Sequence, residues 1–206
     1  MLDMPLNQKK EPAHVLDIYL FIDPIDTSCH QCATEILDFL NTLNMKVYTH
    51  FIPYFNLKTI DEYIKKYQLP TTDLTLRNKI YETDYLIGLT YKAATFQGKR
   101  KARQFLAQLK VLTDTYRHNL TDEDILGIAE LSNLDLSMLL EDRQSENAKY
   151  LYQKDLEIAH KFSISKVPSI IVFDSCRPNG ILIEEDITVS HIQHVIETSM
   201  DCLKAK

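Results

Sequence analysis

Apolar positions near the start of the chain follow two different periods in succession. The run LDIYLFI at 16–22 is apolar enough for a short buried strand, and KVYTHFI at 46–52 has a similar character. Between them, Ile36, Leu37 and Leu40 recur at helical spacing and predict a helix over 31–43. A strand, a helix and a strand within this length predict a βαβ unit of about the minimum size for a parallel crossover.

Helical spacing dominates the middle of the chain. Helices are predicted over 57–67, 85–96, 101–116, 122–131, 136–146 and 147–162. Thr121 is followed by three acidic residues, which is the pattern of an N-cap and an acidic first turn. The stretch 71–84 has no clear period and is expected to be a loop with some helix. Because no strand pattern interrupts 85–162, this region is predicted to be entirely helical.

Strand patterns return near the end of the chain. SIIVF at 169–173 follows directly after Val167 and Pro168, and GILIE at 180–184 is a candidate hairpin partner. A closing helix is predicted over 187–203, with Ser190 as its N-cap. The predicted order of elements is therefore βαβ, a block of helices, and ββα.

A Cys-x-x-Cys pair, Cys29 and Cys32, lies where the first strand gives way to the first helix. A pair in this position is typical of a thioredoxin-like redox fold. Unpaired N–H groups and the positive end of the helix dipole stabilise a thiolate there. We therefore expect Cys29 to be the exposed attacking sulfur and Cys32 the buried resolving one. Half of a zinc site is an alternative, although a structural site needs four ligands and the sequence has no second cysteine pair.

The order of elements and the cysteine pair together predict an α/β fold class: a thioredoxin-like core (βαβ…ββα) with a large all-helical insertion. Residues 15–56 and 163–206 are assigned to the core and residues 57–162 to the insertion. Residues 1–14 are polar and are expected to form a flexible arm.

Pro168 is a second candidate site residue. In a thioredoxin-like fold, a proline just before this strand is the cis-proline that faces the cysteines. Cis bonds account for only about 5–6% of X–Pro bonds in folded proteins, but a proline inside a strand is otherwise disfavoured. We expect a cis Pro168 that leaves the backbone of Val167 free to pair with a bound peptide beside Cys29. A trans proline that merely begins the strand is the alternative.

Composition narrows the range of partners. The chain has 206 residues and a formal net charge of −6, which argues against nucleic acid or an anionic membrane as the main partner. No apolar run approaches the ~20 residues of a membrane span. The first residues lack the apolar region of a secretory signal, and four cysteines do not make a disulfide framework in a chain of this size. These features favour a cytoplasmic protein with reduced thiols; a mature form whose signal has been removed is the alternative.

Other reactive or charged residues are scattered. The histidines lack the spacing of metal ligands, and Cys176 and Cys202 are interpreted as structural or incidental thiols. The one basic cluster consists of Lys99, Arg100, Lys101 and Arg103. Such a run is usually a solvated helix face, and the functional alternative is a docking site for an acidic partner surface. Three tyrosines are candidates for an exposed patch: Tyr48, Tyr54 and Tyr63.

Five segments resemble one known family. They are IYLFIDP at 18–24, KAATFQGKRKARQFLAQL at 92–109, NLTDEDILGIAE at 119–130, LDLSMLLEDRQSENA at 134–148 and QKDLEIAHKFSISKVPSIIVF at 153–173. Together they resemble the DsbA-like branch of the thioredoxin superfamily, and within it the YjbH/SpxH group of adaptors of low-GC Gram-positive bacteria. One departure is His30-Gln31 between the cysteines, where DsbA has a Pro-His pair; His30 is still a candidate for favouring the Cys29 thiolate.

The resemblance implies a particular function. Members of that group hold the transcription regulator Spx and present it to the ClpXP protease. By resemblance, this chain is expected to be a cytoplasmic adaptor with an Spx-like regulator and ClpXP as partners and with no cofactor. Redox activity would then be secondary or vestigial. The resemblance identifies no partner-binding residues.

Two other functions are compatible with the residues. A thiol–disulfide oxidoreductase or isomerase would use Cys29 to attack a substrate disulfide and Cys32 to release the mixed disulfide. A sensor would use oxidation of the same pair to tune partner binding. Turnover of a disulfide and a Cys29 pKa well below about 8.5 would favour the enzyme. The sequence leaves the oligomeric state open.

Overall fold

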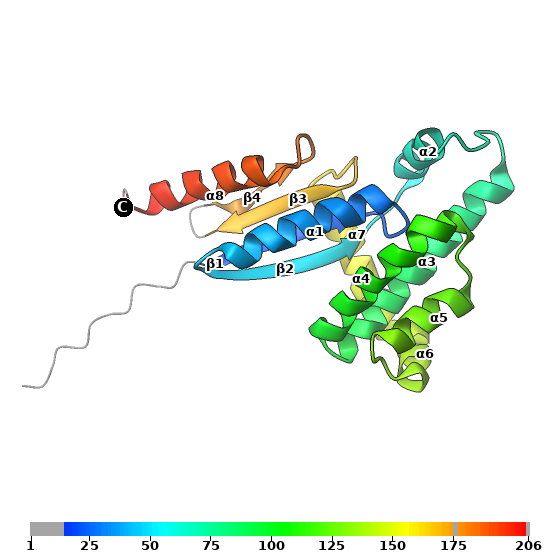
Figure 1. Ribbon diagram of the computed structural model, residues 1–206. Coiled ribbons are helices and arrows are strands. Elements are labelled where there is room, and N and C mark those ends of the chain that lie inside the picture. Colours follow the sequence, from blue (N-terminus) through cyan, green and yellow to red (C-terminus); the bar gives the residue numbers. More distant parts are fainter. Residues whose placement is uncertain (1–14, 175–176, 205–206) are drawn as a thin grey trace, which may run out of the picture.

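The computed structural model describes residues 15–174 and 177–204, so the predicted arm at 1–14 and Cys176 lie outside the described residues. Its centre is a four-stranded sheet in the order β2–β1–β3–β4 (Figure 1). β1 (Val15–Ile22) runs parallel to β2 (Lys46–Pro53). On its other side β1 pairs antiparallel with β3 (Ser169–Asp174), which forms a hairpin with β4 (Arg177–Ile183). The predicted parallel unit and the predicted hairpin are both confirmed.

One face of the sheet is covered by α1 (Thr27–Thr42) and α8 (Val189–Lys204) (Figure 1). The buried positions of α1 recur every three or four residues and include Ala33, Ile36 and Leu40. This spacing places them in one stripe, which packs on the side chains that β1 presents to the same core. α8 begins one residue before Ser190, and the Thr188 hydroxyl accepts a hydrogen bond from His191 N. The prediction of Ser190 as the N-cap was therefore wrong.

The opposite face is covered by α7 (Glu146–Lys161). Ala159 of α7 packs in a second core with Phe21, Ile52 and Ile171 of three neighbouring strands. Half-buried and buried residues alternate along the first part of β1, and its last three residues, Leu20–Ile22, are all buried. Both faces of the sheet are therefore covered at this end of β1, which accounts for the apolar run there.

The remaining helices form a block at one end of the sheet (Figure 1). They are α2 (Leu57–Lys66), α3 (Leu74–Phe96), α4 (Lys99–Tyr116), α5 (Asp122–Leu131) and α6 (Leu136–Gln144). No strand interrupts residues 85–162, as predicted, and Thr121 caps α5 by accepting from Asp124 N. The stretch 71–84, expected to be a loop with some helix, is helical from Leu74 onward, because α3 begins there with Asp73 as its N-cap. Among the described helices none is long and apolar enough to cross a membrane.

Candidate functional site

The start of α1 and the proline loop meet at the same end of β1. β1 ends at Ile22, and a short turn leads directly into α1 at Thr27. On the neighbouring strand, Ser169 is paired with Phe21, so Pro168 lies at this end as well. The Val167–Pro168 peptide bond is cis, as predicted. The cysteine-bearing turn of α1 and the cis-proline loop therefore lie at the same end of the central strands. The predicted role of the Val167 backbone in peptide binding stays a prediction.

Glu184, which the sequence did not single out, holds the proline loop. Its Oε1 accepts hydrogen bonds from the backbone N–H of Ser165 at 2.8 Å and of Lys166 at 3.3 Å. The Ser169 hydroxyl donates to the carbonyl of Lys166 at 2.6 Å and closes the same loop. An acidic residue at the end of a strand carries no special signal in a sequence, so only the fold reveals this role.

The two cysteines have the opposite placement to the one predicted. Cys29 is fully buried in the main core, whereas Cys32 is only partly buried and its Sγ lies 3.9 Å from the carbonyl oxygen of Ile187. The reason is where the helix begins. α1 starts at Thr27 and not near residue 31, so Cys29 is already its third residue and shares the buried stripe with Ala33 and Ile36. Cys32 is turned to the flank beside the segment that leads into α8.

Neither thiol is poised for attack. Burial, together with the charges of Asp23 and Asp26, raises the pKa of the Cys29 thiol well above its ordinary value. Burial raises the pKa of Cys32 to about 11, with a smaller contribution from Glu35. Because the thiolate is the nucleophile, both shifts favour the less reactive thiol form at neutral pH. The expected low pKa of Cys29 is therefore corrected.

A carboxylate occupies the place where an attacking thiolate was expected. Asp26 is the N-cap of α1, and its Oδ1 accepts from Ser28 N at 2.9 Å, from Lys66 Nζ at 2.7 Å and from Tyr67 OH at 3.0 Å. Burial alone would raise the pKa of Asp26, but the hydrogen bonds from Lys66 and Ser28 hold it below its ordinary value. Asp26 precedes Cys29 by three residues, which is the spacing within a Cys-x-x-Cys pair. The anion site at this helix start is thus already filled.

His30 does not favour a thiolate. Its side chain is buried, and its Nε2 lies 2.7 Å from the carbonyl oxygen of Pro24. Burial lowers the pKa of His30, so the imidazole is neutral at pH 7 and gives Cys29 no positive charge. The predicted tuning role of His30 is replaced by a structural one, which fixes the turn before α1.

Two carboxyl groups are buried beneath the same turn. Asp23, in the turn after β1, accepts from Ile25 N at 2.9 Å, and Asp84 comes from α3. Burial and the charge of Asp26 raise the pKa of Asp23 to about 7. Burial, and then Asp23, raise the pKa of Asp84 well above its ordinary value. Both oxygens of Asp84 are buried without a hydrogen-bond partner among the described residues, which fits an uncharged carboxyl.

The remaining candidates do not add a catalytic group. Among the described residues, no cluster of three or more histidine, cysteine or acidic side chains is arranged to hold a metal ion. Tyr54 and Tyr63 are buried, contrary to the prediction of an exposed patch, and only Tyr48 is exposed. Fold and site together define a thioredoxin-like protein with a block of helices between its second and third strands, and with a cysteine pair of which Cys29 is buried and Cys32 partly buried.

A family model described as thioredoxin matches residues 19–194, and the chain belongs to this family. Its relatives include the ClpXP adapter protein SpxH of Bacillus licheniformis, which is 27% identical over 84% of this chain and 66% of that protein. The protein of the same name from Bacillus subtilis is 26% identical over 80% of this chain and 60% of that protein. The protein of the same name from Staphylococcus haemolyticus is 26% identical over 84% of this chain and 61% of that protein. The chain thus spans roughly three fifths to two thirds of the length of these relatives.

Solved structures confirm the DsbA-like fold. A variant of DsbA from Pseudomonas aeruginosa superimposes with a TM-score of 0.64 at 11% identity, over 96% of this chain and 92% of that one. The cytosolic disulfide reductase DsbM from Pseudomonas aeruginosa gives a TM-score of 0.60 at 11% identity, over 90% and 99%. At these identities the likeness concerns the fold and carries no statement about chemistry.

Proposed function

We propose that this chain is a cytoplasmic adaptor that binds an Spx-like regulator and presents it to the ClpXP protease. The observation that carries the proposal is the combination of relatives named ClpXP adapter protein with a cysteine pair that is not built for attack. An adaptor works by binding energy alone, because it raises the local concentration of a substrate at its protease. Such a role needs a scaffold and docking surfaces but no reactive sulfur.

The alternative, thiol–disulfide exchange, is opposed by the same geometry. Exchange requires a thiolate that reaches a substrate disulfide. Cys29 is fully buried, Cys32 has a pKa raised to about 11, and Asp26 fills the anion site at the start of α1. A redox role would therefore need a rearrangement of the α1 turn.

The test is a reconstituted degradation assay with purified ClpXP and Spx, with and without this chain. We expect the Cys29→Ala, Cys32→Ala double variant to accelerate degradation of Spx as much as the unmodified chain does. A circular-dichroism melt checks that the variant is folded, since Cys29→Ala removes buried volume. Loss of acceleration in a folded variant would contradict a purely mechanical role. No acceleration by the unmodified chain would overturn the adaptor itself.

A further inference from the structure

β2 is an edge strand whose outer side is only partly covered. In the sheet order, its hydrogen-bonded neighbour among the described residues is β1 alone. The first half of β2, residues 46–50, is half-buried or exposed, whereas the second half is buried beneath helices. An unpaired edge presents a row of backbone N–H and C=O groups, and extended peptides add to such edges as a further strand.

A hydrogen bond shows which backbone groups point outward. Arg103, on α4, donates from Nη2 to the carbonyl oxygen of Thr49 at 3.3 Å. That carbonyl therefore points away from β1 and toward α4. Alternate residues of a strand point their N–H and C=O groups to the same side, so the N–H and C=O groups of Val47 point outward as those of Thr49 do. The guanidinium of Arg103 stands where the N–H of an added strand would donate.

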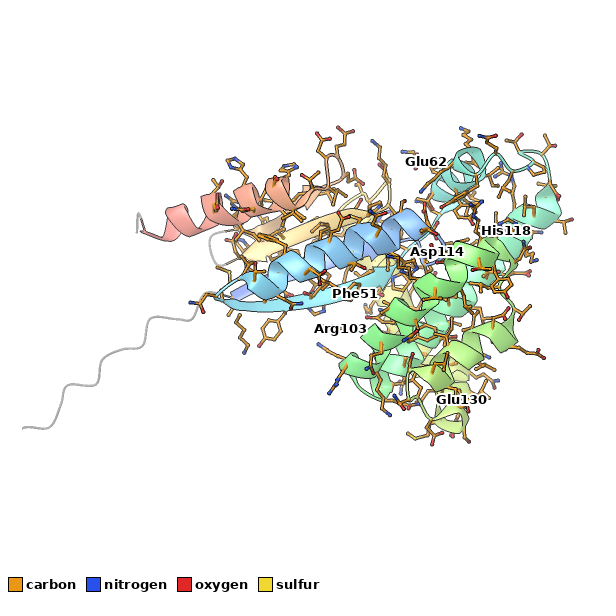
Figure 2. The ribbon with its side chains drawn as sticks, in the orientation of Figure 1. Phe51, Glu62, Arg103, Asp114, His118 and Glu130 are labelled. Atoms are coloured by element: carbon orange, nitrogen blue, oxygen red, sulfur yellow. The ribbon has the colours of Figure 1, made fainter. Side chains whose placement is uncertain are left out.

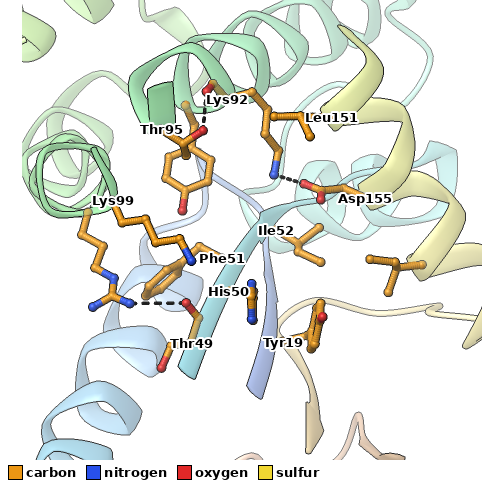
Figure 3. A pocket seen from close by; sticks show the side chains of 13 residues that line it. Tyr19, Thr49, His50, Phe51, Ile52, Lys92, Thr95, Lys99, Leu151 and Asp155 are labelled. Atoms are coloured by element: carbon orange, nitrogen blue, oxygen red, sulfur yellow. Dashed lines mark hydrogen bonds and ion pairs between the residues drawn. The ribbon is translucent and has the colours of Figure 1, made fainter. Parts of the chain in front are cut away.

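A cavity of about 330 Å³ lies between this edge and the helices (Figure 3). In the wider view of Figure 2, Phe51 of β2 and Arg103 of α4, which both line this cavity, lie close to each other. The cavity wraps round the edge of the sheet, because it is lined by side chains from both faces of β2. Its charged and aromatic lining includes His50, Phe51, Tyr91, Lys92, Lys99 and Arg103.

The lining has a surplus of positive charge. Lys92 forms a buried ion pair with Asp155, which is the one carboxylate of the lining. His50 is bound outside the cavity, to Asp17 at 2.6 Å. Lys99 and Arg103 have no carboxylate partner within the residues that the structure describes, and Figure 3 shows Lys99 extending toward Phe51. A site with two unmatched cations, one of them a guanidinium, is suited to a carboxylate.

We propose that the open edge of β2 binds an extended acidic segment of a partner protein. The segment adds as a strand beside Val47 and Thr49, and one of its glutamate or aspartate side chains enters the cavity between Lys99 and Arg103. In doing so it draws the guanidinium of Arg103 away from the Thr49 carbonyl, which then accepts an N–H from the added strand. The inference stands apart from the proposed function, since it concerns binding of a peptide and not degradation.

The competing explanation is that these side chains only protect the edge. Proteins place lysine and arginine on edge strands to prevent pairing with other copies of themselves. Under that explanation, Arg103 and Lys46 shield β2, and their removal would produce dimers or aggregates. The two explanations predict different results for the same variants.

The experiment measures fluorescence anisotropy of a labelled peptide of about ten residues, the length of a long strand, with alternating threonine and glutamate. One control peptide has glutamine in place of glutamate, and a second has proline in place of alternate threonines to remove the N–H donors. The test variant is Lys99→Ala, Arg103→Ala. The matched control is Arg100→Ala, Lys101→Ala, which removes the same charge from the same helix outside the cavity lining.

We expect the test variant to bind the glutamate peptide at least about tenfold more weakly, because two charge-assisted contacts are lost. The matched control should keep most of the affinity, and both control peptides should bind weakly. Backbone amide shifts of Val47 and Thr49 on titration should locate the peptide. Equal losses in the two double variants would reduce the effect to long-range charge and overturn the site. Unchanged peptide binding, or a test variant that merely dimerises on size exclusion, would favour edge protection instead.

Discussion

A carboxylate and a thiolate are stabilised by the same surroundings, namely the free N–H groups of a helix start and a nearby cation. At the start of α1 that place belongs to Asp26, which is bound by Ser28 and Lys66. Cys29 N donates to the Asp26 carbonyl at 3.0 Å, so residue 26 and the buried thiol share one helical turn. The site is therefore one substitution away from a dithiol of the usual spacing.

We predict that Asp26→Cys creates a reactive pair with Cys29. The new thiol, beside Lys66 and the helix start, should have a pKa below about 8.5 and form a reversible disulfide with Cys29. Mass spectrometry after equilibration in glutathione buffers measures the disulfide, and reduction of insulin measures the activity. Asp26→Ser is the control, because it keeps a capping hydroxyl without a thiol. A variant that stays fully reduced under oxidising buffers would contradict the placement.

At the residue scale, the sequence predicted where site residues lie in the fold better than which way their side chains face. The predicted thioredoxin-like fold, with a proline just before a strand, was enough for cis Pro168, and the acidic first turn was enough for the Thr121 cap. The cysteine pair was different, because a helix turns by about 100° per residue and the facing of each thiol depends on the first residue of the helix. The sequence pattern placed the start of this helix at residue 31, whereas the helix begins at Thr27 with Asp26 as its N-cap.

At the scale of elements, α3 and α7 approach each other closely. A Cβ atom placed on Gly88 of α3 would lie 2.7 Å from Cε2 of Tyr152 on α7, closer than side chains pack. Tyr152 is buried and cannot easily move away. The other mid-helix glycine, Gly127 of α5, is exposed and would meet nothing within 4 Å. Gly88 therefore allows the close contact between α3 and α7, whereas no contact of Gly127 requires a glycine.

We predict that Gly88→Ala and Gly127→Ala change stability in opposite directions. The clash with Tyr152 should lower the free energy of unfolding by about 1–3 kcal/mol, less the gain from better helix propensity. Gly127→Ala should raise it by about 0.5–1 kcal/mol, since only the propensity changes. Urea unfolding of both variants measures the difference. Equal stabilisation by both changes would show that α7 can yield at this contact.

The first half of α3 is the part of the secondary structure that the sequence pattern predicted least well. The first half of α3 is mostly exposed, and over 74–84 its buried residues are Ile80, Thr83 and Asp84, of which two are polar. A helix without one apolar stripe has no clear period, so its first half at 74–84 could not be recognised from the pattern. Helices with a single buried face, such as α1 and α4, were recognised with errors of a few residues at their ends.

At the scale of the whole molecule, the core and the helical block meet through buried carboxyl groups. Asp23 belongs to the turn after β1, and Asp84 belongs to α3. Asp26 and its partner Lys66 act on the pKa of Asp23, and Asp26 also acts on the pKa of Asp84. Ionisation of both carboxyls would leave two negative charges in a buried interface, so the junction is sensitive to pH.

We predict that stability falls as pH rises from about 4 to about 7. In that window an unfolded carboxyl has lost its proton, whereas Asp23, with its pKa raised to about 7, and Asp84, with its pKa raised further, keep theirs. The folded state binds more protons, so its free energy of unfolding decreases with pH by about 1.4 kcal/mol per unit for each retained proton. Urea unfolding across this range measures the slope.

Asp84→Asn should make that slope shallower, because the amide has no proton to retain. Asp38→Asn, an exposed position on α1, is the matched control and should leave the slope unchanged. An unaltered slope in Asp84→Asn would exclude the buried pair as its source. Neither carboxyl could be assigned this role from the sequence, because the two lie sixty-one positions apart and only the docking of α3 against the β1 turn brings them together.

The central place of β1 has a mechanical meaning. From Asp17 to Phe21 each residue of β1 is paired on both sides, with β2 and with β3. Tension on the chain ahead of Val15 acts along the strand and loads both ladders in shear, so many hydrogen bonds must yield at once. Tension from the opposite end pulls first on α8, a surface helix that can peel away turn by turn. We therefore expect β1 to resist an applied pulling force more strongly than α8 does.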